Sequence, residues 1–322
     1  MELDRDDYKI QNKDYKAPIV LFVYNRPETL KITLDSLKNN LLISESELYI
    51  FSDGPKNEED KRDILKVRKV IRKIDWCKRI EIIENTENLG CAKSVIQGVN
   101  YVFEKYNEII VLEDDLELSP AFLTYMNSCL KHYSDNKNIH TISGFIFRNF
   151  KYPFFWKDTF LYTRHFPCGW AIWKDRWVTY DMTNSFIRKF FRDKRNIIRT
   201  CEVGKELYKL GLLQLKGFVD AWDIIMILNI IHNYGYAVYP KKSLLKHIGE
   251  DSKSTHVKSF SVMHKPSLWT TVPSRYNFSN NKRFINYIKS HFNRIYNNKV
   301  SLLSKLFFYL IGFKNDFQHL KD

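Results

Sequence analysis

Short runs of apolar residues alternate with amphipathic segments through the first 120 residues of the chain. The apolar runs are rich in Ile, Val, Leu and Phe and end in polar or turn-forming residues, which is typical of buried strands. Such strands are expected at residues 18–24, 48–51, 80–83 and 109–112. Helices are expected after them, up to residue 39 and then at 58–73, 92–106 and 120–134. This β-α-β-α-β-α-β order with short connections predicts a parallel, right-handed, doubly wound sheet.

The pattern becomes less regular after residue 134. Strands are expected at residues 139–144 and 235–240, and an apolar helix leads from the segment 219–223 to about residue 233. Residues 150–180 are dense in aromatic side chains. Most of these rings are expected in the core. The alternative for one or two of them is a stacking surface for sugar faces or bases, with Trp170 as the first candidate.

Three acids follow the fourth predicted strand directly: Glu113, Asp114 and Asp115. Ser119 and Pro120 come next and predict the N-cap and first turn of a helix. The acids therefore lie at the carboxyl end of a buried strand, where open α/β sheets bind their ligands. Side chains alternate along a strand, so Asp114 is expected to point away from the other two. A site for Mg²⁺ or Mn²⁺ and a solvated acidic turn both fit this pattern.

The composition is that of a globular chain of 322 residues with a formal net charge of +14. This positive charge favours a negatively charged binding partner. Such a partner is a nucleic acid, an anionic membrane surface or a phosphorylated substrate. The five cysteines form no CxxC pair, which argues against a disulfide framework or a zinc site and favours a reducing compartment. The acidic start of the chain lacks the apolar region of a signal peptide, and no apolar run reaches the length of a membrane span. A cytoplasmic protein is expected.

Both ends of the chain differ from its centre. Residues 1–16 form a polar lead-in, and residues 281–322 carry eight Lys or Arg against two Asp or Glu, a net charge of +6. Apolar residues in this tail recur at helical spacing from Phe284 to Tyr296, which fits either an interfacial helix on an anionic membrane or a helical cap on the main domain. A second basic amphipathic cluster lies at residues 186–195.

The motifs at the strand ends together resemble those of GT-A-fold nucleotide-sugar glycosyltransferases. The resemblance is closest to the family of N-acetylglucosaminyltransferase I and its bacterial relatives, and it covers roughly residues 17–260. It rests on Asn25-Arg26-Pro27, Ser52-Asp53-Gly54, Asn88-Leu89-Gly90, the string Val111 to Phe122 that contains the acids, the segment Leu161 to Trp177, Trp222-Asp223, and the loop Gly249 to His256.

The resemblance implies a GT-A (Rossmann-like) α/β fold, with a mostly parallel central sheet flanked by helices and a helical C-terminal extension. The catalytic domain would cover residues 17–260, with a nucleotide-binding half at 17–118 and an acceptor half at 119–260. The basic amphipathic tail would cover residues 261–322.

The resemblance also implies roles for individual residues. Asp115 would bind a divalent metal, Mn²⁺ or Mg²⁺, that holds the nucleotide diphosphate. Asp53 would contact the uracil ring and Arg26 the diphosphate, a task that suits a guanidinium. Glu113 and Asp114 would contact the nucleoside of the donor or hold the shape of the site. Further donor contacts would come from Asn88, Trp170 and His256. Where the family has a histidine before the acidic motif, this chain has Ser94, which leaves the donor contacts at that position open.

Asp223 would be the general base that deprotonates the acceptor hydroxyl, and Asp220 is the alternative. Simpler interpretations remain beside these roles. An aspartate at a helix start favours the helix dipole whatever its chemistry, and Asp53 before Gly54-Pro55 fits an ordinary turn.

The function implied is inverting, metal-dependent transfer of a sugar from a UDP-sugar, of the UDP-GlcNAc kind, to a hydroxyl of a glycan or lipid-linked glycan. The setting would be bacterial surface polysaccharide synthesis on the inner face of the membrane, with the basic tail on anionic lipid and no nucleic-acid partner. One alternative is a nucleotidyltransferase that makes a sugar nucleotide, but the first turn, Asn25-Arg26-Pro27, lacks the glycines such an enzyme needs. The other is a non-catalytic basic protein that binds membrane or nucleic acid, which leaves the three acids unexplained.

Overall fold

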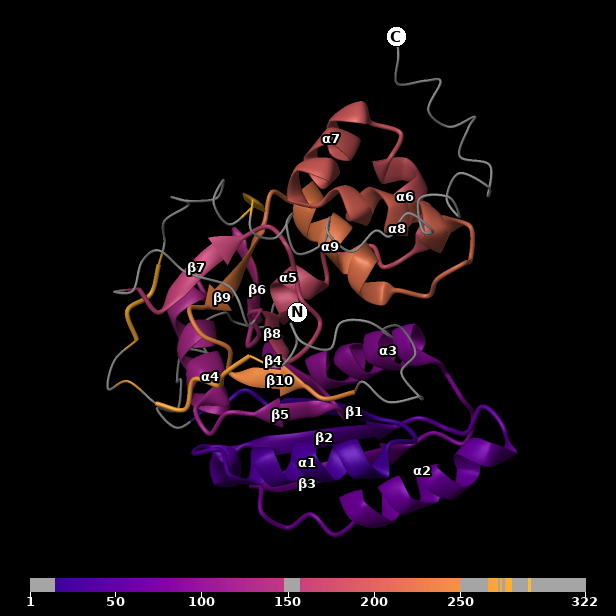
Figure 1. Ribbon diagram of the computed structural model, residues 1–322, viewed down its shortest axis with the longest axis vertical. Coiled ribbons are helices and arrows are strands. Elements are labelled where there is room, and N and C mark those ends of the chain that lie inside the picture. The colour runs from indigo at the N-terminus through magenta and orange to yellow at the C-terminus, as the bar shows by residue number, and fades with distance from the viewer. Residues whose placement is uncertain are drawn as a thin grey trace, which may run out of the picture.

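A computed structural model describes residues 15–147, 157–249, 266–271, 273, 276–279 and 289–290 of the chain. Its central feature is an eight-stranded sheet with the order β3-β2-β1-β4-β8-β6-β9-β7. Helices cover both faces of this sheet (Figure 1). The arrangement confirms the predicted α/β class of fold with a mostly parallel central sheet.

The first half of the sheet is the predicted parallel unit. Strands β3, β2, β1 and β4 pair in parallel, and α1, α2 and α3 connect them. Asn57 caps the start of α2, because its side chain accepts a hydrogen bond from the amide of Asp60 at 3.0 Å. The elements of this half are β1 (Ile19–Val23), α1 (Pro27–Lys38), the short 3-10 helix η2 (Ile43–Glu45), β2 (Glu47–Ser52), α2 (Glu58–Ile71), β3 (Arg79–Glu84), α3 (Cys91–Phe103) and β4 (Glu108–Glu113).

Alternate residues of β1 serve the two faces of the sheet. Ile19 and Leu21 pack into the cluster that contains the buried face of α1. Val20 and Phe22 pack on the opposite side with the apolar residues of α3. All five residues of β1 are buried, so the strand lies between two apolar layers. This double burial explains why the sequence shows a continuous apolar run there.

The second half of the sheet contains antiparallel pairs. β8 pairs antiparallel with both β4 and β6, and β7 pairs antiparallel with β9. Helices α6 to α9 form a group at one end of the molecule, uppermost in Figure 1. The elements are α4 (Phe122–Tyr133), β6 (Ile139–Ser143), β7 (Thr159–Tyr162), β8 (Trp170–Trp173), α5 (Lys174–Trp177), α6 (Asn184–Phe190), α7 (Lys194–Val203), α8 (Lys205–Leu215), α9 (Trp222–His232) and β9 (Tyr236–Pro240).

A second sheet of two strands lies beside the acidic turn. It pairs β5 (Leu116–Leu118) with β10 (Leu245–His247) in antiparallel register, and the sequence did not predict either strand. The helix expected to be capped by Ser119 begins later, at Phe122. The Ser119 hydroxyl instead accepts from the amide of Ala121 and donates to the carbonyl of Trp269. It therefore joins α4 to the chain that follows residue 265.

Most of the predicted C-terminal tail lies outside the described residues, so its helical character stays a prediction. The described part at residues 266–279 packs on α4 and β7. The carbonyl of Ser279 accepts from the hydroxyl of Tyr133 at 2.8 Å, and the amide of Asn277 donates to the carboxylate of Asp158 at 2.6 Å.

Candidate functional site

The candidate site forms where β4 ends. Glu113 is the last residue of β4, and Asp114 and Asp115 make the turn into β5. Arg26 lies just before α1, at the end of the neighbouring parallel strand β1. The topology therefore brings Arg26 to the three acids, as the sequence predicted for polar residues that follow parallel strands.

Asp115 is the centre of this site. Its Oδ2 accepts a hydrogen bond from Arg26 Nη1 at 2.8 Å and lies 3.3 Å from His247 Nε2. Its backbone carbonyl accepts from the amide of Ile248 at 2.8 Å. Its Oδ1 is buried and has no hydrogen-bond partner among the described residues. A buried carboxylate oxygen without a partner is free to bind a cation or to accept a hydrogen bond from a ligand.

The charges around Asp115 keep it ionised. Burial alone would raise the pKa of Asp115, but the hydrogen bond and charge of His247, followed by those of Arg26, outweigh burial and lower it. The pKa of His247 is raised in return: burial opposes this, and the hydrogen bond to Asp115 and the negative charges of Asp115 and Glu113 outweigh burial. Asp115 is thus a fixed negative charge held by two basic side chains.

The other two acids have different surroundings. Burial raises the pKa of Glu113 to about 8, and the charge of Asp115 adds to this. Burial and the charge of Asp115 raise the pKa of Asp114 to about 7, although its Oδ2 accepts from the amide of Tyr24 at 2.9 Å. That bond ties the end of β1 to the end of β4, which fits the predicted role of Asp114 in holding the shape of the site.

The donor set suits a hard divalent cation. Among the described residues, no group of three or more His, Cys, Asp or Glu side chains is placed to enclose a metal. Mg²⁺ and Mn²⁺ commonly need only one or two carboxylates, because phosphate oxygens and water complete their shell. The partnerless Oδ1 of Asp115 supplies one such ligand. His247 is a second candidate beside it, provided that it gives up its proton when the dication binds, because only a neutral imidazole binds a metal. Burial is the main cause of the raised pKa values of Glu113 and Asp114, and a dication there would relieve the repulsion from Asp115 that adds to it.

Gly249 leaves the space that this arrangement occupies. A Cβ at position 249 would lie 2.0 Å from Asp115 Oδ2 and 2.8 Å from Arg26 Nη1. Gly249→Ala is therefore expected to displace both side chains and to weaken metal-dependent nucleotide binding by at least about tenfold, since misplaced supporting groups alone cost 10–100-fold at metal sites. Calorimetric titration measures this loss. Gly217→Ala is the control for binding, because a Cβ at Gly217 meets no atom within 4 Å. Its φ of +74° makes alanine cost stability by about 1–2 kcal/mol, so thermal unfolding must show that this variant is folded before its affinity is compared. Equal affinity of Gly249→Ala and wild type would contradict the described packing.

Asp53 follows β2 and Asn88 follows β3, and the two side chains lie close together. They form hydrogen bonds with each other and with the backbone of their two loops. The two oxygens of Asp53 accept hydrogen bonds from Asn88 Nδ2 at 3.1 Å and from the amides of Leu89 and Gly90 at 2.9 and 3.1 Å. Asn88 Nδ2 also donates to the carbonyl of Gly54 at 2.9 Å. This placement favours the turn role of Asp53 over the predicted uracil contact, because its acceptor sites are already used. The donor role of Asn88 stays a prediction.

Trp170 requires a correction. It was the first candidate for a stacking surface, but it is 0% exposed and lies in β8, opposite Val111 of β4. Both faces of its ring are covered by protein, so it offers no surface to a sugar. Its ring centroid lies 5.6 Å from that of Trp222, the residue before Asp223. Trp170 therefore supports the segment that carries Asp223.

Asp220 and Asp223 both reach this region of the molecule. Asp223 is half-buried in the first turn of α9, whereas Asp220 is exposed ahead of that helix. The thiol of Cys91, at the start of α3, is exposed at the surface. The surrounding protein and the charges of Glu113, Asp223 and Asp220 still raise its pKa. Asp223 also contributes to the raised pKa of Glu113. The charge of Asp223 is thus part of the same cluster as the acids that end β4.

Two further positions complete the comparison with the sequence. His256 lies outside the described residues, so its predicted donor contact stays a prediction. His247 is a site residue that the sequence reasoning did not select. Its position depends on the antiparallel pairing of β10 with β5, in which His247 lies opposite Leu116. Three-residue strands give no periodic signal in a sequence.

The family model described as Glycosyl transferase family 2 matches residues 19–197, which is more than half of the 322 residues. The chain belongs to glycosyl transferase family 2. This membership confirms the predicted kind of enzyme, a glycosyltransferase. The narrower resemblance to the N-acetylglucosaminyltransferase I family stays a prediction. A comparison with curated proteins finds no match.

Solved structures similar to this family 2 chain are distant. The mannosyltransferase PcManGT from Pyrobaculum calidifontis, in complex with GDP-Man and Mn²⁺, is 12% identical with a TM-score of 0.32, over 50% of this chain and 46% of that one. S. aureus TarS 1–349 is 13% identical with a TM-score of 0.30, over 40% and 34%. A 4-diphosphocytidyl-2C-methyl-D-erythritol synthase from Anaerococcus prevotii is 10% identical with a TM-score of 0.36, over 70% and 89%. The chain thus spans less than half the length of the first two, and likeness at this level carries no argument about substrates.

Among the described residues of this family 2 chain, no helix combines the length and apolar character that crossing a bilayer requires.

Proposed function

We propose that this family 2 chain transfers a sugar from a UDP-sugar to a hydroxyl group of a glycan, with a divalent metal and with inversion at the transferred carbon. The observation that carries the proposal is the arrangement at Asp115. One carboxylate oxygen is held by two basic side chains and the other is buried without a hydrogen-bond partner among the described residues. This arrangement lies at the carboxyl end of a central parallel strand, where a nucleotide is expected to bind.

Each side chain has a distinct task in this proposal. Asp115 and His247 would hold the metal, which supplies positive charge to the leaving diphosphate when bound. Arg26 would donate two hydrogen bonds to diphosphate oxygens in place of its present bond to Asp115. Asp223 would accept the proton of the acceptor hydroxyl as that oxygen attacks the anomeric carbon. The bond from that carbon to UDP breaks on the opposite face, so a single displacement inverts the configuration.

The identity of the donor rests on the resemblance to N-acetylglucosaminyltransferase I, which supports uridine and a UDP-GlcNAc-like sugar. The acceptor we propose is a glycan or lipid-linked glycan of bacterial surface polysaccharide synthesis, met at the inner face of the membrane. Exposed basic side chains on α6, on α7 and between them support attraction to an anionic surface. They are Arg188, Lys189, Arg192, Lys194 and Arg195. The same attraction by the C-terminal tail is proposed from its sequence alone.

The test is calorimetric titration of UDP into the full chain with and without Mn²⁺, with GDP and CDP as comparison nucleotides. We expect UDP to bind in the presence of Mn²⁺ and at least about tenfold more weakly without it, because the diphosphate charge then lacks its counterion. UDP binding of equal affinity with and without Mn²⁺ would contradict the proposed metal dependence. Tighter binding of GDP or CDP than of UDP would contradict the proposed UDP-sugar donor. Release of pyrophosphate from UTP and a sugar 1-phosphate would instead identify a nucleotidyltransferase.

A further inference from the structure

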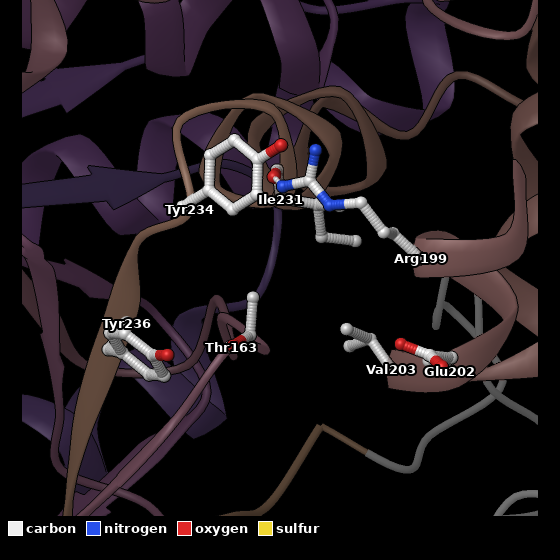
Figure 2. Close-up of a pocket in the computed structure, with 7 residues that line it drawn as sticks. All are labelled: Thr163, Arg199, Glu202, Val203, Ile231, Tyr234 and Tyr236. Carbon is white, nitrogen blue, oxygen red and sulfur yellow. Dashed lines mark hydrogen bonds between the residues drawn. The ribbon is translucent and has the colours of Figure 1, made fainter. Parts of the chain in front are cut away.

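A cavity of about 130 Å³ lies away from the acidic site, between α7, the end of α9 and the start of β9 (Figure 2). Figure 2 shows Tyr234 and Arg199 on one side of it, Glu202 and Val203 on another, and Tyr236 and Thr163 on a third. The helix α9 ends at His232, nine residues after Asp223, so its far end lies about 14 Å from Asp223 along the helix axis. The cavity is therefore no part of the site proposed for the donor.

Tyr234 has an unusual backbone at the rim of this cavity. Its φ is +54°, and among the described residues it is the one non-glycine residue with a positive φ. It follows α9, where its amide donates to the carbonyl of Ile231 at 3.2 Å and the amide of Gly235 donates to the carbonyl of Ile230 at 2.9 Å. Glycine or asparagine usually occupies such a position after a helix, because a side chain is disfavoured there. A bulky residue kept in that conformation suggests a function for its side chain.

The glycine of this turn is Gly235, the residue after Tyr234, and it does not take the position with the positive φ. A Cβ at Gly235 would lie 2.3 Å from the ring of His140, so position 235 is fixed by close packing. Packing against His140 explains the glycine at position 235. Neither this packing nor the end of α9 requires an aromatic residue at position 234.

The ring of Tyr234 is exposed but held in place. Its exposed fraction is 71%, and the guanidinium carbon of Arg199 lies 3.6 Å from its ring centroid. Arg199 in turn donates to the carbonyl of Ile231 and to Asn196 Oδ1. A rigid exposed aromatic ring loses little conformational freedom when a ligand packs on it.

The lining favours a neutral ligand rich in hydroxyl groups. Glu202 is an exposed carboxylate on the rim and would repel an anion, and the guanidinium of Arg199 is already engaged. Two tyrosines offer apolar ring faces with polar edges, and Thr163 and Glu202 offer hydrogen-bonding groups. Sugars combine apolar C–H faces with hydroxyl groups, and they match this combination.

We propose that this cavity is a saccharide-binding subsite that holds part of the glycan acceptor at a distance from the reaction centre. The choice of an acceptor glycan rests on the proposed function. Apolar contact with Tyr234 and hydrogen bonds to Glu202 supply the binding, and α9 links the subsite to Asp223.

The test uses saturation-transfer NMR on the full chain without nucleotide or metal. The probes are glucose, galactose, N-acetylglucosamine, lactose, maltose and N,N′-diacetylchitobiose. We expect at least one of them to bind, and we expect Tyr234→Gly and Glu202→Gln each to weaken that binding at least tenfold. Tyr234→Gly should fold well because glycine tolerates the positive φ. Phe218→Ala is the matched control, because Phe218 is an aromatic residue of 60% exposure that does not line the cavity.

Three results would overturn the subsite. They are no binding by any probe, unchanged binding in Tyr234→Gly, and displacement of the saccharide by inorganic phosphate, which would indicate an anion site. Titration of UDP with Mn²⁺ into Tyr234→Gly separates this proposal from the proposed function. We expect this variant to bind UDP with wild-type affinity. If saccharide binding depends on Tyr234 while UDP does not bind wild type, the proposed function fails and the subsite stands. If UDP binds and no probe does, the subsite fails alone.

Discussion

Replacement of Asp115 by alanine is expected to remove metal-dependent UDP binding, with a loss of affinity above about 100-fold. Loss of a residue that merely supports a metal ligand costs 10–100-fold, and Asp115 is the proposed ligand itself. Its Oδ1 is a buried carboxylate oxygen without a hydrogen-bond partner among the described residues, so the variant removes the acceptor that this site offers to a cation. Titration of UDP with and without Mn²⁺ measures the loss, and in the variant Mn²⁺ should no longer strengthen UDP binding.

Two variants control for this experiment. Glu117→Gln changes a carboxylate two residues further along, whose partner is Lys246 at 3.0 Å, and it should leave UDP binding unchanged. Asp115→Asn also removes the anion that Arg26 and His247 face, a loss that costs about 3–5 kcal/mol at a fully buried pair. It keeps the side-chain volume and one oxygen acceptor, so it disturbs the packing less than alanine does. Thermal unfolding shows whether each variant is folded. Metal-dependent UDP binding at wild-type affinity in folded Asp115→Ala would exclude Asp115 as the ligand.

The sequence predicted the parallel half of the fold well because its signals there are local. Strand β1 was expected at residues 18–24 and occupies Ile19–Val23, since burial on both faces makes it an unbroken apolar run. The second half gave weaker signals. All four residues of β8, Trp170–Trp173, are buried within an aromatic segment that shows no period, so the strand could not be separated from its neighbours.

The candidate site divides in the same way. Arg26 and the acids could be predicted because each follows a parallel strand, and parallel strands end at one edge of a sheet. His247 could not, because it reaches Asp115 through a pairing of two three-residue strands more than 120 residues apart. The role given to Trp170 failed for another reason. A sequence does not distinguish a tryptophan that stacks on a sugar from one that fills the core. The structure does, because it places Trp170 fully buried in β8.

Replacement of Asp223 by asparagine is expected to lower turnover by about 10²–10⁴-fold, the usual contribution of a general base, while UDP binding with Mn²⁺ stays at the wild-type level. The amide keeps the size of the side chain but cannot accept the proton of the acceptor hydroxyl. This loss equals about 2.7–5.5 kcal/mol of transition-state stabilisation. The measurement is the rate of UDP release from the UDP-sugar that wild type accepts in a donor screen, beside a calorimetric titration of UDP.

The paired variant Asp220→Asn decides between the two aspartates. Asp220 is exposed ahead of α9, and its replacement should leave turnover within about twofold of wild type if Asp223 is the base, since surface substitutions are usually near neutral. If Asp223 serves only the helix dipole, Asp223→Asn should change stability by about 0.3–1 kcal/mol and leave turnover unaltered. Loss of turnover in Asp220→Asn with full activity in Asp223→Asn would assign the base to Asp220. Asp223 shares the charge cluster of the acids that end β4 but is not a proposed metal ligand, and neither is Asp220. Unchanged UDP binding in both variants would therefore separate the proton-transfer step from assembly of the donor site.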